Sequence, residues 1–122
     1  MVNKHLEDSE SWFRSGKEEL GKNNRVAVAQ FTHAMIKALD ALFEEKLGKI
    51  PSRHEESTEY FKELLRKNKI DGKESKYKRN IQEILREKND ADYHGGYFSK
   101  SDAEKREKQV RRIISMVENY VE

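Results

Sequence analysis

Residues 25–47 constrain the fold of this chain more than any other stretch of the sequence. Apolar side chains cover most sides of a helix drawn through them: Val26, Val28, Phe31, Met35, Ala38, Leu39, Leu42 and Phe43. Polar side chains recur at spacings of three and four along one narrow stripe: Gln30, His33, Lys37, Asp40 and Glu44. Such a helix is covered by other helices on nearly every side, so the stretch predicts the central helix of a bundle.

Four amphipathic stretches accompany the central one, and they predict helices over residues 5–20, 53–67, 73–92 and about 101–120. Gly21 and Gly48 are typical helix ends, and Pro51 prevents the second helix from continuing. Helix starts are indicated by Ser52 with Glu55, by Asp71 or Ser75, and by Ser101 with Glu104. We therefore expect an all-α fold, an antiparallel up-and-down bundle of about five helices that forms a single domain over residues 1–122.

The composition of the chain fits a small bundle with a thin core. Charged residues make up 39% of the sequence and apolar residues 34%, so most of the surface must be ionic. The absence of Cys excludes disulfides, thiolate metal sites and a Cys nucleophile. Abundant Lys and Glu without Cys are also typical of thermophilic proteins. The start MVNKHLEDSE has no apolar core, and we expect no membrane span and a cytoplasmic protein.

Basic residues are concentrated in the second half of the sequence. Residues 62–88 carry 10 Lys and Arg against 5 Asp and Glu. This segment could attract phosphate groups, although a solvated helix surface of mixed charge explains the same count.

The apolar stripe of the predicted helix 73–92 turns polar in its last turn. On a helical wheel, Lys88 and Asp92 continue the face of Ile81 and Ile84, whereas Arg86 points the opposite way. Two interpretations stay open. In the first, Lys88 covers apolar surface and pairs with Asp92 at i+4, and the glycines that follow end the helix. In the second, these charges line a polar cleft that forms a functional site.

The segment KNDADYHGGYF, residues 88–98, resembles the signature region of HEPN domains, which are small helical proteins. Ala91, Asp92 and Tyr93 match one branch of that family as they stand. Lys88 occupies the position of the family Arg, Asn89 follows it, and five residues separate Lys88 from His94. The segment FTHAMIKALDALFEEKLGKIPSRHEE is similar to the second helix and following turn of the same branch. The resemblance covers about residues 10–120.

The resemblance implies a metal-independent ribonuclease site. In many HEPN domains a His transfers protons during attack of the ribose 2′-OH on the adjacent phosphate, and an Arg holds the phosphate. By this resemblance the candidate catalytic residues are Lys88, Asn89 and His94. Lys offers a point charge in place of the planar fork of Arg, so this exchange is not conservative. Arg86 lies one residue outside the family spacing.

A second group of residues is expected to bind a ligand beside this site: Asp92, Tyr93 and Arg106. Arg106 lies on the inner face of the last helix, where an ion pair with Asp92 or Asp90 is its favoured role. Asp90 and His94 share a helical face, but without further ligands nearby they do not indicate a metal. We expect neither a metal nor a cofactor.

The family resemblance also implies partners. It favours a homodimer, with Tyr93, Tyr97 and Phe98 as candidate contacts, that binds nucleotide or RNA and pairs with a small nucleotidyltransferase in a toxin-antitoxin arrangement. A ribonuclease toxin with a composite Lys/Asn/His site between two copies is the alternative. A purely structural helical dimer is the third.

Overall fold

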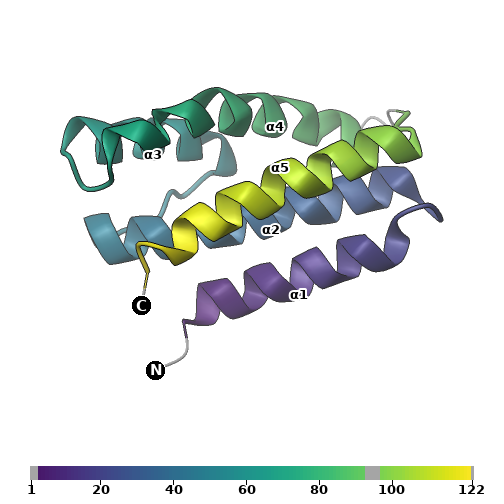
Figure 1. Cartoon of the computed structure of the whole chain (residues 1–122), viewed down its shortest axis with the longest axis horizontal. Helices are drawn as coiled ribbons and strands as arrows, with labels where there is room; N and C mark the ends of the chain where they lie inside the picture. The colour runs from purple at the N-terminus through teal and green to yellow at the C-terminus, as the bar shows by residue number, and fades with distance from the viewer. Residues whose placement is uncertain (1–2, 93–96, 122) are drawn as a thin grey trace.

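The computed structural model describes residues 3–92 and 97–121, with only the backbone described for residues 89–92. Within these residues the chain is helical and contains no strand (Figure 1). Five α-helices occur in the order α1 (Lys4–Glu19), α2 (Asn24–Leu47), α3 (Ser57–Arg66), α4 (Lys76–Asp92) and α5 (Lys100–Glu118). Short 3-10 turns, η1 (His54–Glu56) and η2 (Gly72–Ser75), precede α3 and α4. The prediction of an all-α bundle of about five helices is confirmed.

Helix α2 is the centre of the bundle, as its sequence predicts. Contacts join α2 to each of the other four α-helices. Figure 1 shows α1 along one side of α2, α5 across it and α4 beyond α5. The fully buried core of α2 includes Phe31, Met35, Leu39, Leu42 and Phe43. The predicted stripe of α5 faces this core, with Ala103, Val110, Ile113, Ile114 and Val117 all at 0% exposure.

By length and composition alone, α2 is long and apolar enough to cross a membrane. Its most apolar window has a mean hydropathy of 1.2, and it is the one such helix in the described part of the chain. However, 72% of that window is buried inside the bundle. The other helices therefore supply the apolar surroundings of α2 within the bundle.

The capping box predicted for α5 is displaced by two residues, and α3 and α4 begin at Ser57 and Lys76, four and three residues after their predicted starts. The capping box of α5 consists of Ser99 and Asp102 rather than Ser101 and Glu104. The Ser99 hydroxyl accepts a hydrogen bond from the Asp102 N–H at 3.0 Å, and the Asp102 carboxylate accepts one from the Ser99 N–H at 2.9 Å. Both pairs have the required spacing in the sequence, so spacing alone could not select between them.

The start of the third helix shows a similar shift. Glu56, rather than Glu55, accepts hydrogen bonds from the Arg53 N–H at 3.0 Å and from the Ser52 hydroxyl at 3.1 Å. Asp71 caps η2 by accepting from the Lys73 N–H, and α4 begins only at Lys76. The predicted end of α2 is confirmed, because Gly48 adopts a left-handed conformation with φ of 72°, which favours Gly.

Candidate functional site

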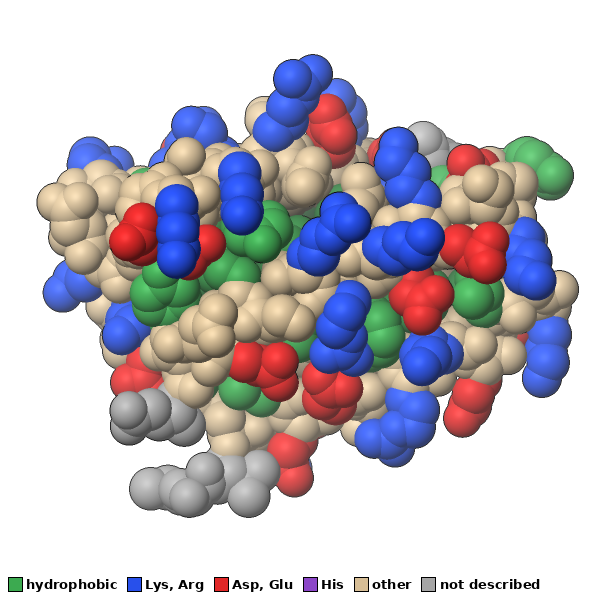
Figure 2. Space-filling view, in the orientation of Figure 1, with side chains coloured by type: hydrophobic (Ala, Val, Ile, Leu, Met, Phe, Trp, Pro, Cys, Tyr) green, Lys and Arg blue, Asp and Glu red, His purple; other side chains and the backbone are tan. Residues whose placement is uncertain are grey.

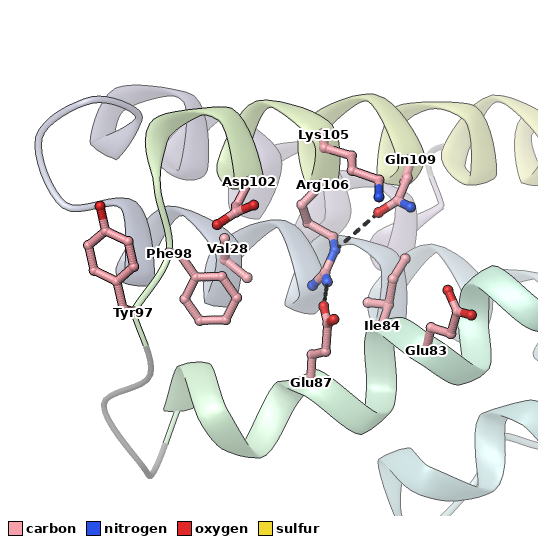
Figure 3. Close-up of a pocket in the computed structure, with 10 residues that line it drawn as sticks. All are labelled: Val28, Glu83, Ile84, Glu87, Tyr97, Phe98, Asp102, Lys105, Arg106 and Gln109. Atoms are coloured by element: carbon pink, nitrogen blue, oxygen red, sulfur yellow. Dashed lines mark hydrogen bonds and ion pairs between the residues drawn. The ribbon is translucent and has the colours of Figure 1, made fainter.

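A polar pocket of about 230 Å³ lies where α4 and α5 meet over the first half of α2. Figure 3 shows its lining, which comes from all three helices and from the segment just before α5: Val28, Glu83, Ile84, Glu87, Tyr97, Phe98, Asp102, Lys105, Arg106 and Gln109. The pocket therefore has an apolar floor from Val28 and Ile84 and a rim of ionic and aromatic side chains.

Arg106 is the buried charge of this pocket, with 6% of its surface exposed. Its Nη1 donates to the Thr32 hydroxyl oxygen at 3.1 Å, and its Nη2 forms an ion pair with the Glu87 carboxylate. Its Nε also donates to the Gln109 side-chain oxygen at 3.4 Å (Figure 3). The guanidinium is thus fixed by contacts from α2, α4 and its own helix.

Thr32 provides the polar contact that lets a charged group lie against the core. It has 0% exposure and is surrounded by the apolar face of α2. Its hydroxyl donates to the Val28 carbonyl oxygen at 2.9 Å, which leaves the oxygen lone pairs available to Arg106. The Thr32 hydroxyl therefore donates its hydrogen bond within α2 and accepts one from Arg106 of α5.

The electrostatic environment of Arg106 is asymmetric. Burial lowers the pKa of its guanidinium below its usual value, while the Glu87 carboxylate opposes that shift. A guanidinium remains charged at neutral pH under such conditions. Its partner is far less buried, because half of the Glu87 side chain is exposed to solvent. An anion from solution can therefore compete with Glu87 for a cation that the fold already holds in place.

The aromatic rim adds a surface for stacking. The Tyr97 side chain is 89% exposed to solvent. Phe98, the next residue, is half-buried against the core. Figure 3 places the Phe98 ring at the end of the pocket near Asp102 and the Tyr97 ring farther out, pointing away from the other lining residues. An apolar floor, an aromatic rim and a buried guanidinium together suit a ligand that has a flat ring and a phosphate.

Among the predicted site residues whose side chains the structure describes, Arg106 lies in this pocket and Lys88 does not line it. The described ion pair of Arg106 is with Glu87, rather than with the expected Asp90 or Asp92, whose side chains lie outside the described residues. Glu87 precedes those positions along α4, and Arg106 reaches it across the gap between α4 and α5 (Figure 3). The inner-face position of Arg106 is as predicted.

The other predicted site residues lie around the end of α4. Lys88 is half-buried on α4 and is not part of the pocket lining. Asn89 and Asp92 belong to the last turns of α4, but their side chains lie outside the described residues, as do Tyr93 and His94 entirely. Arg86 is exposed, as the helical wheel predicts.

Three residues that contact Arg106 were not predicted from the sequence: Thr32, Glu87 and Gln109. The sequence contains a signal for two of them, Gln109 and Thr32, in the spacing of polar residues along α5 and α2. Asp102, Arg106 and Gln109 recur at i, i+4 and i+7, which places a polar stripe beside the apolar stripe of α5. Thr32 breaks the apolar pattern of the central helix and falls outside its polar stripe.

Three histidines gather away from this pocket, around the polar stripe of α2. The His33 ring lies 5.0 Å from the Trp12 ring and 6.1 Å from the His54 ring, and His5 Nε2 lies 3.6 Å from a Glu44 carboxylate oxygen. Among the described residues, no group of three or more His, Asp or Glu side chains could hold a metal ion.

A five-helix bundle with a polar pocket between its last two helices places this protein in the class of small all-α domains. Comparison with protein families identifies it further: a model of the HEPN domain matches residues 2–120, and the chain belongs to the HEPN family. Comparisons with curated proteins and with solved structures gave no match.

Proposed function

We propose that this HEPN protein binds a nucleotide or an RNA strand in the pocket between α4 and α5, in the cytoplasm and as a homodimer. The observation that carries the proposal is the buried guanidinium of Arg106 beside the half-exposed Glu87. Arg binds phosphate oxygens through two parallel N–H donors, and here the fold has already fixed the side chain. Little conformational entropy is then lost when a ligand binds.

Binding would proceed by exchange of one anion for another. A phosphate enters beside Lys105, displaces the Glu87 carboxylate into solvent and accepts hydrogen bonds from Arg106. The base packs against Phe98 and Tyr97, since every base has a flat face for stacking. The Gln109 side chain, now in contact with Arg106, can donate and accept hydrogen bonds at a base edge.

Calorimetry with a mononucleotide tests this binding mode. Glu87→Gln removes the competing charge and should increase affinity, whereas Arg106→Met keeps the side-chain volume and should abolish binding. Arg66→Met serves as the control, because Arg66 is exposed on α3 and makes no contact with the pocket. Equal affinities for wild type, Glu87→Gln and Arg106→Met would refute the pocket as the site.

The homodimer is part of the proposal, and the 89% exposed Tyr97 beside the pocket supports it. A second copy that covers Tyr97 and Phe98 would bury both rings and close the site. Light scattering at micromolar concentration should give twice the chain mass of 14.4 kDa, and a mass of one chain would exclude a composite site. Pull-down with a small nucleotidyltransferase encoded next to this protein tests the toxin-antitoxin pairing.

A metal-independent ribonuclease is the second candidate function. It is favoured by the position of Lys88, which directly follows Glu87 of the pocket on α4. In this scheme His94 transfers protons and Lys88 holds the phosphate, with Asn89 beside it. RNA should then be cut in EDTA to give 2′,3′-cyclic phosphate ends.

Three variants separate this enzyme from a binding module. His94→Ala should lower the cleavage rate by about 10² to 10⁴, the range for a general acid or base. Lys88→Arg restores the family residue and should keep or raise activity. Arg86→Ala is the control, since Arg86 is exposed on the opposite side of α4. If wild type and Lys88→Arg both leave RNA intact, the protein is a binding module without catalysis. If nucleotides also fail to bind, it is a structural dimer.

A further inference from the structure

A second hollow, of about 440 Å³, lies on the other flank of α5, between α5 and α1. We call it the basic groove, and its lining residues are Phe13, Lys17, Glu107, Lys108, Arg111 and Arg112. Figure 1 shows α1 below α2 and α5 in front of α2, and a contact between Arg111 and Glu10 joins α5 to α1. On the face turned to the viewer, Figure 2 shows many Lys and Arg side chains over α4 and α5, with Asp and Glu between them.

The floor of the basic groove is a fixed guanidinium. Arg111 lies over the Phe13 ring, with 4.1 Å between the guanidinium carbon and the ring centre. Its two terminal nitrogens donate to the two carboxylate oxygens of Glu10 at 3.1 and 3.3 Å. This pair links α5 to α1, so Arg111 is held flat and its charge is already balanced.

The other three cations of the basic groove have no such balance. Lys17, Lys108 and Arg112 are exposed, and within the described part of the chain none of them has a carboxylate within ion-pair distance. Elsewhere on the same surface, exposed cations such as Lys67 and Arg79 do pair with glutamates one turn away. Three unpaired positive charges around one hollow favour an anionic partner with several charges.

The basic groove is also connected to the Arg106 pocket. Lys105, Lys108 and Arg112 are all exposed and follow one another at i, i+3 and i+7, so they form one row along α5. Seven residues of helix span about 10 Å. Lys105 belongs to the pocket and the other two to the groove, so a flexible polyanion can contact both without leaving α5.

We infer that the basic groove is a docking surface for the sugar-phosphate backbone of single-stranded RNA, separate from the pocket that takes the nucleotide. This inference rests on the proposed function for the identity of the polyanion. Single-stranded nucleic acid combines regular phosphate charges with bases that stack on aromatic rings and on guanidinium planes. Arg111, held flat on Phe13, offers such a plane, and Lys17, Lys108 and Arg112 surround it with charge.

Fluorescence anisotropy with a labelled ten-residue oligouridine tests the basic groove, with salt varied from 50 to 200 mM. The variant is Lys17→Gln/Lys108→Gln/Arg112→Gln, whose three sites are exposed and should leave the fold intact by circular dichroism. The matched control is Arg66→Gln/Lys69→Gln/Lys73→Gln, which removes the same charge from exposed positions elsewhere. Each phosphate contact contributes about 0.7 to the logarithmic salt slope of a single strand.

The groove variant should bind the oligouridine at least about tenfold more weakly. Its logarithmic salt slope should fall by about 2, because three phosphate contacts of about 0.7 each are lost. The control variant should lose less than about threefold. Equal losses in the two variants would overturn the inference, as would tighter binding of polyglutamate than of oligouridine. Mononucleotide binding separates the two proposals, because the groove variant should retain it and Arg106→Met should lose it.

Discussion

The Thr32 hydroxyl and the Arg106 guanidinium meet inside the bundle, with 3.1 Å between Oγ1 and Nη1. This contact joins the central helix α2 to α5 at a point where both residues are almost fully buried. It makes the candidate pocket a part of the core rather than an addition to the surface. Stability and ligand binding should therefore depend on the same two side chains.

Thr32→Val tests this coupling because Val has nearly the shape of Thr and lacks the hydroxyl. Arg106 then loses a buried acceptor, and the free energy of unfolding should fall by about 1–3 kcal/mol. Thr32→Ser keeps the hydroxyl and should recover part of that loss. Chemical denaturation measures both variants, and equal stability of Thr32→Val and wild type would show that the contact contributes nothing.

Gly16→Ala should destabilise the packing of α1 on α2. A Cβ at Gly16 would lie 2.7 Å from two carbons of the Phe31 ring, which is fully buried. Overpacking of this kind destabilises a protein by about 1–3 kcal/mol. This exceeds the stabilisation expected from the higher helix propensity of Ala relative to Gly. Gly72→Ala is the matched control, because nothing lies within 4 Å of its Cβ position and its stability should be unchanged or slightly higher. Thermal melts would contradict this account if the two variants shifted alike.

Tyr120→Phe should loosen the connection between the end of the chain and the turn before α4. The Tyr120 hydroxyl donates to a Glu74 carboxylate oxygen at 2.7 Å and accepts from the Asp71 N–H at 3.1 Å. Loss of each hydrogen bond should lower the free energy of unfolding by about 0.5–1.5 kcal/mol, and by less where water replaces the hydroxyl. Amide exchange around Asp71 should become faster, and unchanged exchange there would argue against the contact.

Asp40→Asn should stabilise the protein at neutral pH. Burial raises the pKa of the Asp40 carboxyl above its usual 3.8, and the nearby positive charges of His5, Lys37 and His54 offset this only in part, while Glu44 adds to it. The folded chain therefore holds this proton to a higher pH than the unfolded chain does. The stability contributed by the protonated form is lost as pH rises from 3.8 through the raised pKa.

The difference between Asp40→Asn and wild type gives the measurement for that prediction. The variant cannot ionise, so its advantage should be full above the raised pKa of Asp40 and should shrink as the pH falls toward 3.8. Urea titrations at a series of pH values report this difference directly. A constant difference across the series would mean that the folded chain does not perturb the Asp40 carboxyl.

The sequence predicts the helices well because their signals are local and strong. The apolar pattern of α2 and the stripe of α5 identify the core face of each helix, and Gly48 identifies where α2 ends. Helix starts were less certain, since Ser99 with Asp102 and Ser101 with Glu104 have the same spacing. Only the backbone of residue 99, which is extended, decides between them.

The candidate site was only partly predictable for a different reason. Arg106 was identified because its position on the α5 wheel is a local property. Its contacts with Thr32 and Glu87 span 74 and 19 residues of sequence, so they depend on how three helices pack together. No spacing rule within one helix reports such a contact. The family signature directed attention to the end of α4, where the side chains lie outside the described residues.

The most direct test of the account is an NMR titration of the protein with a mononucleotide, in which backbone amide shifts locate the ligand. The account predicts that the largest changes occur at Thr32, Glu87, Arg106 and Gln109 and in the segment of Tyr97 and Phe98, and that Arg106→Met abolishes them. Changes confined to another face, such as the one around Trp12 and His33, or no changes at millimolar nucleotide, would contradict it.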